Sequence, residues 1–415
     1  MFKFNFSAAD LDVDDFELAG GQHEGDQADE LSQPLESLSV VSSPSPSTLV
    51  PTSQLDIQSR SCLQSLPQTL HFELAQIPVL NQGSGAATAI AIDTKTGNKK
   101  EIVTIYKRNL EDVKFQIAQE DDDFDNIDDD NKKESKTKDS GLGGAEMLAL
   151  AGKSDLVKGV YEGGLKTWEC ALDLVAYLAE QKENYDGKKV LELGCGSALP
   201  GIYVLTQSNL VRVDLQDYND QVLKLVTLPN VLLNTCLRPD QQPAQEVEED
   251  EDRKEMAKSE GDQEGDEDED EDEEPETDPA DGDFRAVEID LPDTEEQRLE
   301  LVKKVDAHTK FIMGDWSGLV DLMAYNSEDD KYDLILTSET IYAEESHPKL
   351  FAAIKNSLKR GGKALVAAKS FYFGVGGDIL SFRRLIEKDG VFNVKVVFSA
   401  QAFVRREILE LTFKV

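Results

Sequence analysis

The chain has 415 residues and a formal net charge of -40, with 43 Lys and Arg against 83 Asp and Glu. This balance argues against free DNA or RNA as the primary ligand and favours basic protein partners. The length allows two or three domains, but acidic segments dilute the hydrophobic content to 39%, so we expect one large core.

The sequence also disfavours a metal-binding protein and a membrane protein. The four cysteines form no C-x-x-C pair and show no metal-ligand spacing, which predicts a reducing compartment and no metal site. No apolar run approaches the length of a membrane span, and the opening MFKFNFSAADLD lacks a basic and apolar signal sequence. We therefore expect a soluble chain without a membrane partner.

Residues 1–65 are predicted to form a disordered N-terminal tail, because their Ser, Pro, Gln, Asp and Glu cannot bury enough apolar area to fold. Residues 66–140 are predicted to form a small β-hairpin extension and an acidic connector. The extension rests on strand-like alternation at 69–79 and 101–119, with the second stretch turning at Asn109. The connector is the charged run EDDDFDNIDDDNKKESKTKDS.

Residues 141–415 alternate strands with helices, which predicts an α/β domain whose mostly parallel sheet is covered on both faces. One helix is expected at 167–183, where apolar residues recur at helical spacing, and another at 377–389. The last two strands should be antiparallel, because only a short turn joins them. The predicted strands are 189–193, 210–216, 310–314, 332–338, 363–368, 392–399 and 403–414.

An acidic insertion interrupts this domain at about residues 238–284. Its central part, residues 241–280, holds 21 Asp or Glu against three Lys or Arg and cannot pack, so we predict disorder. One interpretation is a solvating low-complexity insertion. The other is an electrostatic lure for a basic substrate, whose effect would fade as salt rises.

The run VLELGCGSALPG at 190–201 carries the strongest chemical signal. An apolar strand that turns through Gly194 and Gly196 lets the backbone approach a ligand that side chains would block. Asp217, at the end of the next strand, is placed to accept hydrogen bonds from a ribose. The dinucleotide fingerprint fails because the third glycine comes late, whereas the acidic Glu192 before the turn suits the cationic amino acid of S-adenosylmethionine. The alternative is a tight turn without a ligand.

Four phrases in this order resemble the histidine protein methyltransferase family: GVYEGGLKTWECALDLVAYL, VLELGCGSALPG, LQDYNDQVLKLVTLPNVLLN and YDLILTSETIY. The resemblance covers about residues 155–415. It implies a seven-stranded, Rossmann-like methyltransferase sheet that binds S-adenosylmethionine at the carboxyl ends of its strands. All seven-strand methyltransferases share the glycine phrase, so EGGLKTWE and QDYN carry the narrower match.

The resemblance also implies a set of cofactor-binding residues. Glu169 or Glu192 would pair with the cofactor's ammonium group, and the face of Trp168 would lie near the sulfonium. Without the resemblance, Trp168 is interpreted as a core anchor on an amphipathic helix. Asp315 would accept from the adenine amino group, or else cap a helix. The implied set is Thr167, Trp168, Glu169, Cys170, Ala171, Glu192, Gly194, Gly196, Gln216, Asp217, Tyr218, Gly314, Asp315, Trp316 and Ser338.

Glu339 and Tyr342, in the phrase SETIY, are assigned to the substrate side and to catalysis, because related protein methyltransferases place a D-x-x-Y pair there. Glu339 would accept from one nitrogen of a substrate imidazole, so that the other nitrogen faces the methyl group. The alternative is that Glu339 caps the following helix. Phe371 and Phe373 either stack on the imidazole or pack against the sheet.

We therefore hypothesise that a methyl group is transferred to the remote (tele) ring nitrogen of a histidine in a basic protein. Imidazole, with a pKa near ~6.5, is largely neutral at pH 7, whereas a lysine, with a pKa near ~10.4, must first lose a proton. The resemblance implies a substrate, the third protein of the large ribosomal subunit, and a location in the cytoplasm and nucleus, including the nucleolus.

We also expect a monomer with no direct nucleic-acid partner. Two alternatives remain open from the sequence. One is a protein-lysine methyltransferase. The other is a non-catalytic acidic binding module or chaperone for basic ribosomal proteins.

Overall fold

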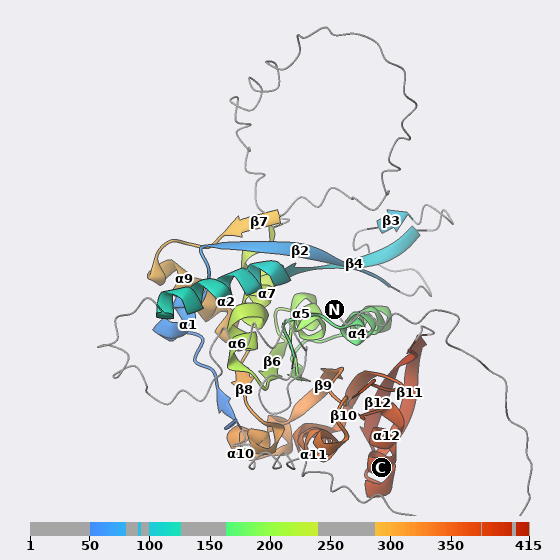
Figure 1. The fold of residues 1–415 in the computed structure, drawn as a ribbon. Coiled ribbons are helices and arrows are strands. Elements are labelled where there is room, and N and C mark those ends of the chain that lie inside the picture. The colour runs from blue at the N-terminus through green and yellow to red at the C-terminus, as the bar shows by residue number, and fades with distance from the viewer. Residues whose placement is uncertain are drawn as a thin grey trace, which may run out of the picture. The chain divides into compact units, whose positions relative to one another are not determined.

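The computed structural model describes residues 50–79, 90–92, 99–125, 163–239, 287–374, 376–400 and 404–414. Its main sheet has eight strands in the order β1-β8-β6-β5-β9-β10-β12-β11 (Figure 1). The strands are β1 (Ser53–Gln54), β5 (Lys189–Leu193), β6 (Arg212–Asp217), β8 (Phe311–Met313), β9 (Tyr332–Ser338), β10 (Leu358–Lys369), β11 (Phe392–Ala400) and β12 (Arg406–Phe413).

The strand directions define where a ligand can bind. β5, β6, β8, β9 and β10 run parallel, whereas β12 is antiparallel to both of its neighbours. The chain order of the strands reverses between β5 and β9, and open α/β sheets bind ligands at the carboxyl ends of strands beside such a reversal. The predicted seven-stranded methyltransferase sheet is confirmed, and the two-residue β1 adds an eighth strand at its edge.

Helices cover both faces of this sheet, because successive strand residues point to opposite sides. In β5, Val190 belongs to one apolar core, whereas Leu191 and Leu193 belong to the other. The first core includes residues of α4 (Glu169–Gln181), α5 (Leu199–Gln207) and α9 (Glu295–Asp306). The second includes residues of α10 (Leu319–Met323), α11 (His347–Ser357) and α12 (Ile379–Asp389).

A helical stretch with two π-helical turns follows β6. It comprises α6 (Asp220–Val222), the π-helical η1 (Leu223–Thr227), α7 (Leu228–Leu232) and the π-helical η2 (Leu233–Leu237). Residues 220–237 are called the π-turn helix below. π-Helical turns are rare and frequently lie at functional sites.

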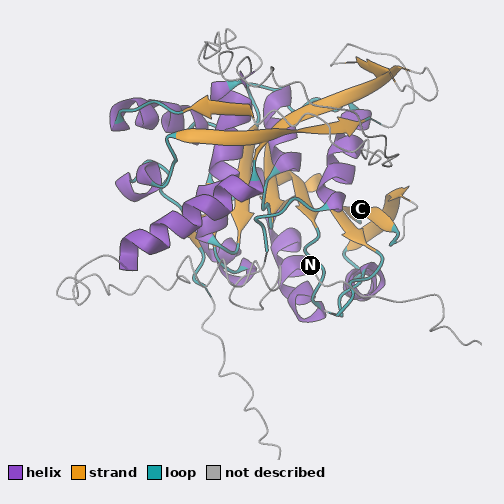
Figure 2. Cartoon of the chain, turned by 45° about the horizontal axis from the view of Figure 1, so that its top comes forward, coloured by secondary structure: helices purple, strands orange, loops and turns teal. Residues whose placement is uncertain are grey.

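A second sheet packs on the π-turn helix, α4 and α5 (Figure 1). Its order is β3-β4-β2-β7, with β2 (Thr69–Pro78) antiparallel to both β4 (Lys99–Arg108) and β7 (Val287–Asp290), and β3 (Ile90–Ile92) beside β4. Figure 2 shows the long strands of this sheet crossing over the helices. Because β7 follows the acidic insertion, this sheet joins segments more than 200 residues apart in the chain.

The structure corrects the predicted hairpin at Asn109. β4 ends before this residue, and α2 (Leu110–Asp125) follows it, with the Asn109 Oδ1 accepting from the backbone N–H of Glu111 at 2.8 Å. The polar Asn109 therefore begins a helix instead of turning a hairpin. α2 also takes in the first residues of the predicted acidic connector; the rest of the connector lies outside the described residues.

The predicted tail at 1–65 is wrong for its last part. β1 pairs with β8, and α1 (Arg60–Gln64) buries Cys62 and Leu63. The few apolar residues of this last part of the tail pack on the large core, and composition alone does not reveal this packing. Residues 1–49 and most of the acidic insertion lie outside the described residues. Within the described part, no helix is both long and apolar enough to span a membrane.

Candidate active site

Gly194 and Gly196 make the turn after β5, as the sequence predicts. Both have positive φ, 62° and 51°, a backbone region that favours glycine. A Cβ on Gly194 would lie 2.5 Å from the Thr340 side chain, and one on Gly196 would lie 3.3 Å from the backbone of Gly164. The loop is therefore enclosed by two other segments, so only glycines fit.

Asp217 lies at the carboxyl end of β6, beside this loop. Its Oδ2 accepts from the Gly196 N–H at 2.9 Å, and its Oδ1 accepts from the Asn219 N–H at 3.2 Å. A carboxylate has about four acceptor sites, a number that suits the two hydroxyls of a ribose. The structure places Asp217 and Tyr218 beside the glycine loop, and the ribose contact stays a prediction.

The structure corrects the role of Glu192. This residue is only 1% exposed, and its Oε2 accepts from the Gly201 N–H, in the first turn of α5, at 2.8 Å. A Cβ on Gly201 would lie 2.6 Å from that oxygen, which explains why a glycine stands late in the motif. Glu192 thus fixes α5 beneath the loop, and its burial does not support a direct ion pair with a cofactor's ammonium group.

Gln216, in β6, links the glycine loop after β5 to the loop after β8. Its amide oxygen accepts from the Gly194 N–H and from the indole N–H of Trp316, at 3.2 and 2.7 Å. Its amide nitrogen donates to the carbonyl of Gly314 at 2.8 Å. The structure therefore brings together Gly194, Gln216, Gly314 and Trp316, which the sequence assigned to one pocket.

Asp315 has the helix-capping role that the sequence left as the alternative. It caps the short 3₁₀ turn 316–318, its Oδ1 accepting from the backbone N–H of Ser317, and its Oδ2 pairs with Lys349 at 2.8 Å. Burial alone would raise the pKa of Asp315, but the hydrogen bonds from Lys349 and Ser317 hold it below its usual range. Both carboxylate oxygens thus already have donors, which weakens the assignment to adenine.

Two lysine side chains lie near the ring of Trp168. The ammonium groups of Lys166 and Lys369 lie 5.1 and 5.0 Å from the centroid of its ring. These distances are within cation–π range, so a sulfonium at the same ring would be repelled by two positive charges. The structure therefore does not support the predicted sulfonium contact of Trp168.

The other residues of the EGGLKTWE phrase lie close to the loop or to the substrate side. Thr167 donates its hydroxyl to Ser197 at 2.9 Å, and Glu169 pairs with Lys369 at 2.9 Å, so Glu169 already has a cationic partner. Cys170 and Ala171 are buried in the first turn of α4. Burial raises the pKa of Cys170 far above its usual range, so this thiol keeps its proton.

Glu339 follows Ser338 at the carboxyl end of β9 and is 8% exposed. Its φ is 56°, a left-handed conformation that costs a non-glycine residue about 1–2 kcal/mol. Its Oε1 accepts from the Cys170 N–H at 3.4 Å and lies 3.5 Å from the Lys369 ammonium. Its Oε2 is buried and has no hydrogen-bond partner among the residues that the structure describes.

Two tyrosines lie next to Glu339. The rings of Tyr342 and Tyr372 are 6.5 Å apart in an edge-to-face arrangement. Burial raises the pKa of Tyr372 well above its usual range, and the negative charge of Glu339 adds to this effect, so the phenol keeps its proton. Glu339 does not cap the following helix, because α11 begins eight residues later.

An aromatic rim, defined here as Phe371 and Phe373, follows β10 beside this site. The backbone N–H of Gly377 donates to the Tyr342 carbonyl at 2.8 Å, and Tyr372 donates its own N–H to the Gly377 carbonyl, which ties the rim to the SETIY segment. Phe371 and Phe373 are 42% and 72% exposed, with ring centroids 4.7 Å apart. They do not pack into the sheet, which removes one of the two alternatives.

Several residues of the site were missed in the sequence. Lys369 is the last residue of β10 and forms ion pairs with Glu169 and Glu339. Its position at the end of an apolar run was a signal in the sequence that could have identified it. Thr227 and Asn230 donate to the carbonyls of Gly196 and Ser197, at 2.7 and 2.9 Å. Both are fully buried polar residues three positions apart in a mostly apolar stretch of helix, a pattern that could have identified them.

The site fits a nucleoside cofactor with an amino-acid tail. The site combines the glycine loop at the carboxyl end of β5, the carboxylate of Asp217 on β6 and the ring of Trp316 after β8. These groups lie beside the reversal of strand order, where open α/β sheets bind ligands. The fold and this site are those of the class of S-adenosylmethionine-dependent methyltransferases.

Comparison with known proteins gives the family. The chain is 32% identical to histidine protein methyltransferase 1 of Schizosaccharomyces pombe, over 74% of this chain and 76% of that protein. It is 35% identical to a histidine protein methyltransferase 1 homolog of Bos taurus over 267 residues, which are 64% of this chain. The chain belongs to the histidine protein methyltransferase 1 family. Its match spans 59% of the length of the cattle relative and 61% of that of the mouse relative.

Two further comparisons are less specific. Residues 152–258 match a family model described as lysine methyltransferase. Among solved structures, magnesium protoporphyrin IX methyltransferase from Synechocystis is 12% identical, with a TM-score of 0.32, and the match covers 59% of this chain and 82% of that protein. At this TM-score the likeness carries no argument, and the fold class rests on the strand order.

Proposed function

We propose that this chain transfers a methyl group from S-adenosylmethionine to the remote ring nitrogen of a histidine in a basic protein. The observation that carries the proposal is the buried Oε2 of Glu339, directly after the strand that pairs with β5, which has no hydrogen-bond partner within the described part of the chain. A buried oxygen without a donor is costly, so it suits a group that arrives with the substrate. The N–H of a neutral imidazole is such a group.

Glu339 then determines which nitrogen reacts. When its Oε2 accepts from the N–H nearer the histidine backbone, the remote nitrogen holds the lone pair and points away from Glu339 toward the loop. Lys369 and the Cys170 N–H keep the other carboxylate oxygen fixed. The new N–C bond forms as the S–C bond of the donor breaks, and the proton on the first nitrogen remains hydrogen-bonded to Glu339.

A lysine acceptor is the second candidate, because the family model is described as lysine methyltransferase and a 61-residue stretch is 41% identical to EEF1A lysine methyltransferase 3 of Xenopus tropicalis. The chemistry of the site opposes it. A lysine ammonium would pair with Glu339 and stay protonated, and its deprotonation at pH 7 costs about 4–5 kcal/mol. Neutral imidazole meets no such barrier.

We propose that the substrate is a strongly basic protein, the third protein of the large ribosomal subunit. Long-range attraction to a chain with a net charge of -40 raises the rate of encounter with a basic partner. The same attraction serves any basic protein, so it supports the charge of the substrate and not its identity. A purely binding role is opposed by the buried Glu339 Oε2, which lacks a hydrogen-bond partner among the described residues, together with an intact glycine loop.

Matched peptides test the acceptor. Two basic peptides that differ only by His or Lys at one position are incubated with methyl-labelled cofactor and the full chain. We expect label on the histidine peptide alone, and Glu339→Ala to lower its rate by about 100-fold or more. Glu344→Ala, which removes an exposed carboxylate five residues away, is the control and should retain activity. Label on the lysine peptide only would overturn the proposal.

A further inference from the structure

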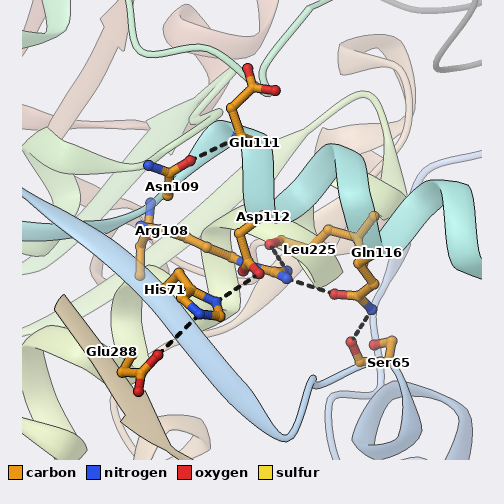
Figure 3. A network of polar contacts seen from close by, with 10 residues as sticks. Ser65, His71, Arg108, Asn109, Glu111, Asp112, Gln116, Leu225 and Glu288 are labelled. Carbon is orange, nitrogen blue, oxygen red and sulfur yellow. Dashed lines mark hydrogen bonds and ion pairs between the residues drawn. The ribbon is translucent and has the colours of Figure 1, made fainter. Parts of the chain in front are cut away.

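The second sheet, β3-β4-β2-β7, is called the N-terminal sheet below, and the glycine loop at 194–197 is called the cofactor loop. The N-terminal sheet is connected to the cofactor loop through the π-turn helix. Arg108, the last residue of β4, has a side chain that is 0% exposed. Figure 3 shows how its guanidinium joins β4 to two other segments: it donates to Asp112 and Gln116 of α2, at 2.7 and 2.8 Å, and to the carbonyl of Leu225 in the π-turn helix at 2.8 Å. Leu225 lies in the first π-helical turn.

Two asparagines on the π-turn helix bind the backbone of β4. Asn230 accepts from the Arg108 N–H at 2.7 Å, and Asn234 accepts from the Tyr106 N–H at 2.9 Å and donates to the Tyr106 carbonyl at 2.6 Å. The two asparagines differ in whether they also contact the cofactor loop. Only Asn230 also reaches the cofactor loop, where its amide donates to the carbonyl of Ser197 at 2.9 Å.

Thr227 supports the same loop from one turn earlier. Its hydroxyl, which is fully buried, donates to the carbonyl of Gly196 at 2.7 Å. Asn230 and Thr227 therefore hold two consecutive carbonyls of the loop that carries Gly194 and Gly196. Buried hydrogen bonds to a glycine-containing turn matter, because glycines alone do not restrict the backbone to one conformation.

A third connection is apolar. Val113 and Ile117 of α2, each 1% exposed, pack in a small core with Leu165, Val222 and Val226. Leu165 lies two residues before Thr167, which bonds to Ser197. The N-terminal extension thus contacts both the π-turn helix and the segment that closes over the loop.

We propose that Asn230 is a positioning residue for the cofactor site, and that the N-terminal sheet acts through it. The Arg108 N–H fixes the orientation of the Asn230 amide, and that amide fixes the loop in the conformation that binds the cofactor. The proposal rests on cofactor binding at the glycine loop, but not on whether the acceptor is histidine or lysine.

Asn230→Ala and Asn234→Ala form a matched pair, because each removes hydrogen bonds to β4 but only the first removes the bond to Ser197. The dissociation constant of S-adenosylhomocysteine is measured by calorimetry on the full chain, and the melting temperature of each variant is recorded. We expect both variants to melt earlier, Asn230→Ala to bind about tenfold more weakly, and Asn234→Ala to stay within about twofold of the original chain.

Kinetics separate positioning from general loss of folding. For Asn230→Ala, KM for S-adenosylmethionine should rise about tenfold, while kcat at saturating cofactor changes by less than about threefold. Equal weakening in both variants, or unchanged affinity in Asn230→Ala, would overturn the proposal. If Asn230→Ala does not fold, Thr227→Val removes the neighbouring bond at nearly constant volume and must weaken cofactor binding in the same way.

Discussion

Glu192 and Gly201 constrain each other across nine residues. The Glu192 Oε2 accepts from the Gly201 N–H at 2.8 Å, and a Cβ on Gly201 would lie 2.6 Å from that oxygen. The late position of the third glycine, Gly201, therefore follows from its contact with a buried carboxyl group. Burial raises the pKa of Glu192 from 4.5 to about 8.

This raised pKa predicts a pH dependence of stability. The folded chain binds the Glu192 proton more tightly than the unfolded chain, so the stabilisation is fully present below pH 4.5 and is lost as pH rises toward 8. Glu192→Gln keeps an acceptor for the Gly201 N–H but cannot titrate. Urea unfolding across this pH range should show a smaller fall in the free energy of unfolding for the variant; equal slopes would contradict the prediction.

Gly194→Ala should abolish detectable cofactor binding, because the new Cβ would lie 2.5 Å from the Thr340 side chain and φ is 62°. Gly187→Ala is the control, since φ there is 71° but nothing lies within 4 Å. Both changes carry a backbone cost of about 1–2 kcal/mol, and only the first blocks the loop. Calorimetric titration of S-adenosylhomocysteine compares them, and similar affinities for the two variants would refute the assignment of the loop.

Phe373→Ala should weaken the protein substrate's interaction without affecting the fold. This side chain is 72% exposed on the aromatic rim, so its removal costs little stability. Aromatic residues at an interface often contribute more than 1 kcal/mol, so KM for a basic protein substrate should rise about tenfold. Leu210→Ala removes a 70% exposed side chain from the segment before β6 and should leave KM unchanged. A rise in KM for both variants would indicate a nonspecific effect.

The sequence predicted what depends on local pattern. The apolar pattern predicts a strand at 332–338, where β9 lies, and Gly194, Gly196 and Asp217 lie together as expected, because strand ends and glycine turns are local features. The pairing of β2 with β7 was missed, since its partners are separated by more than 200 residues. The roles of Trp168 and Asp315 changed because Lys369 and Lys349, distant in the chain, reach them in the fold.

The most direct test of the account is to identify the methylated atom. Large-subunit ribosomal proteins are incubated with the full chain and methyl-labelled S-adenosylmethionine, and the modified residue and ring position are determined by mass spectrometry and NMR. The account predicts one methyl group on the remote ring nitrogen of a histidine, formed by the original chain and lost with Glu339→Ala. Methylation confined to lysine, or to the ring nitrogen nearer the backbone, would contradict it.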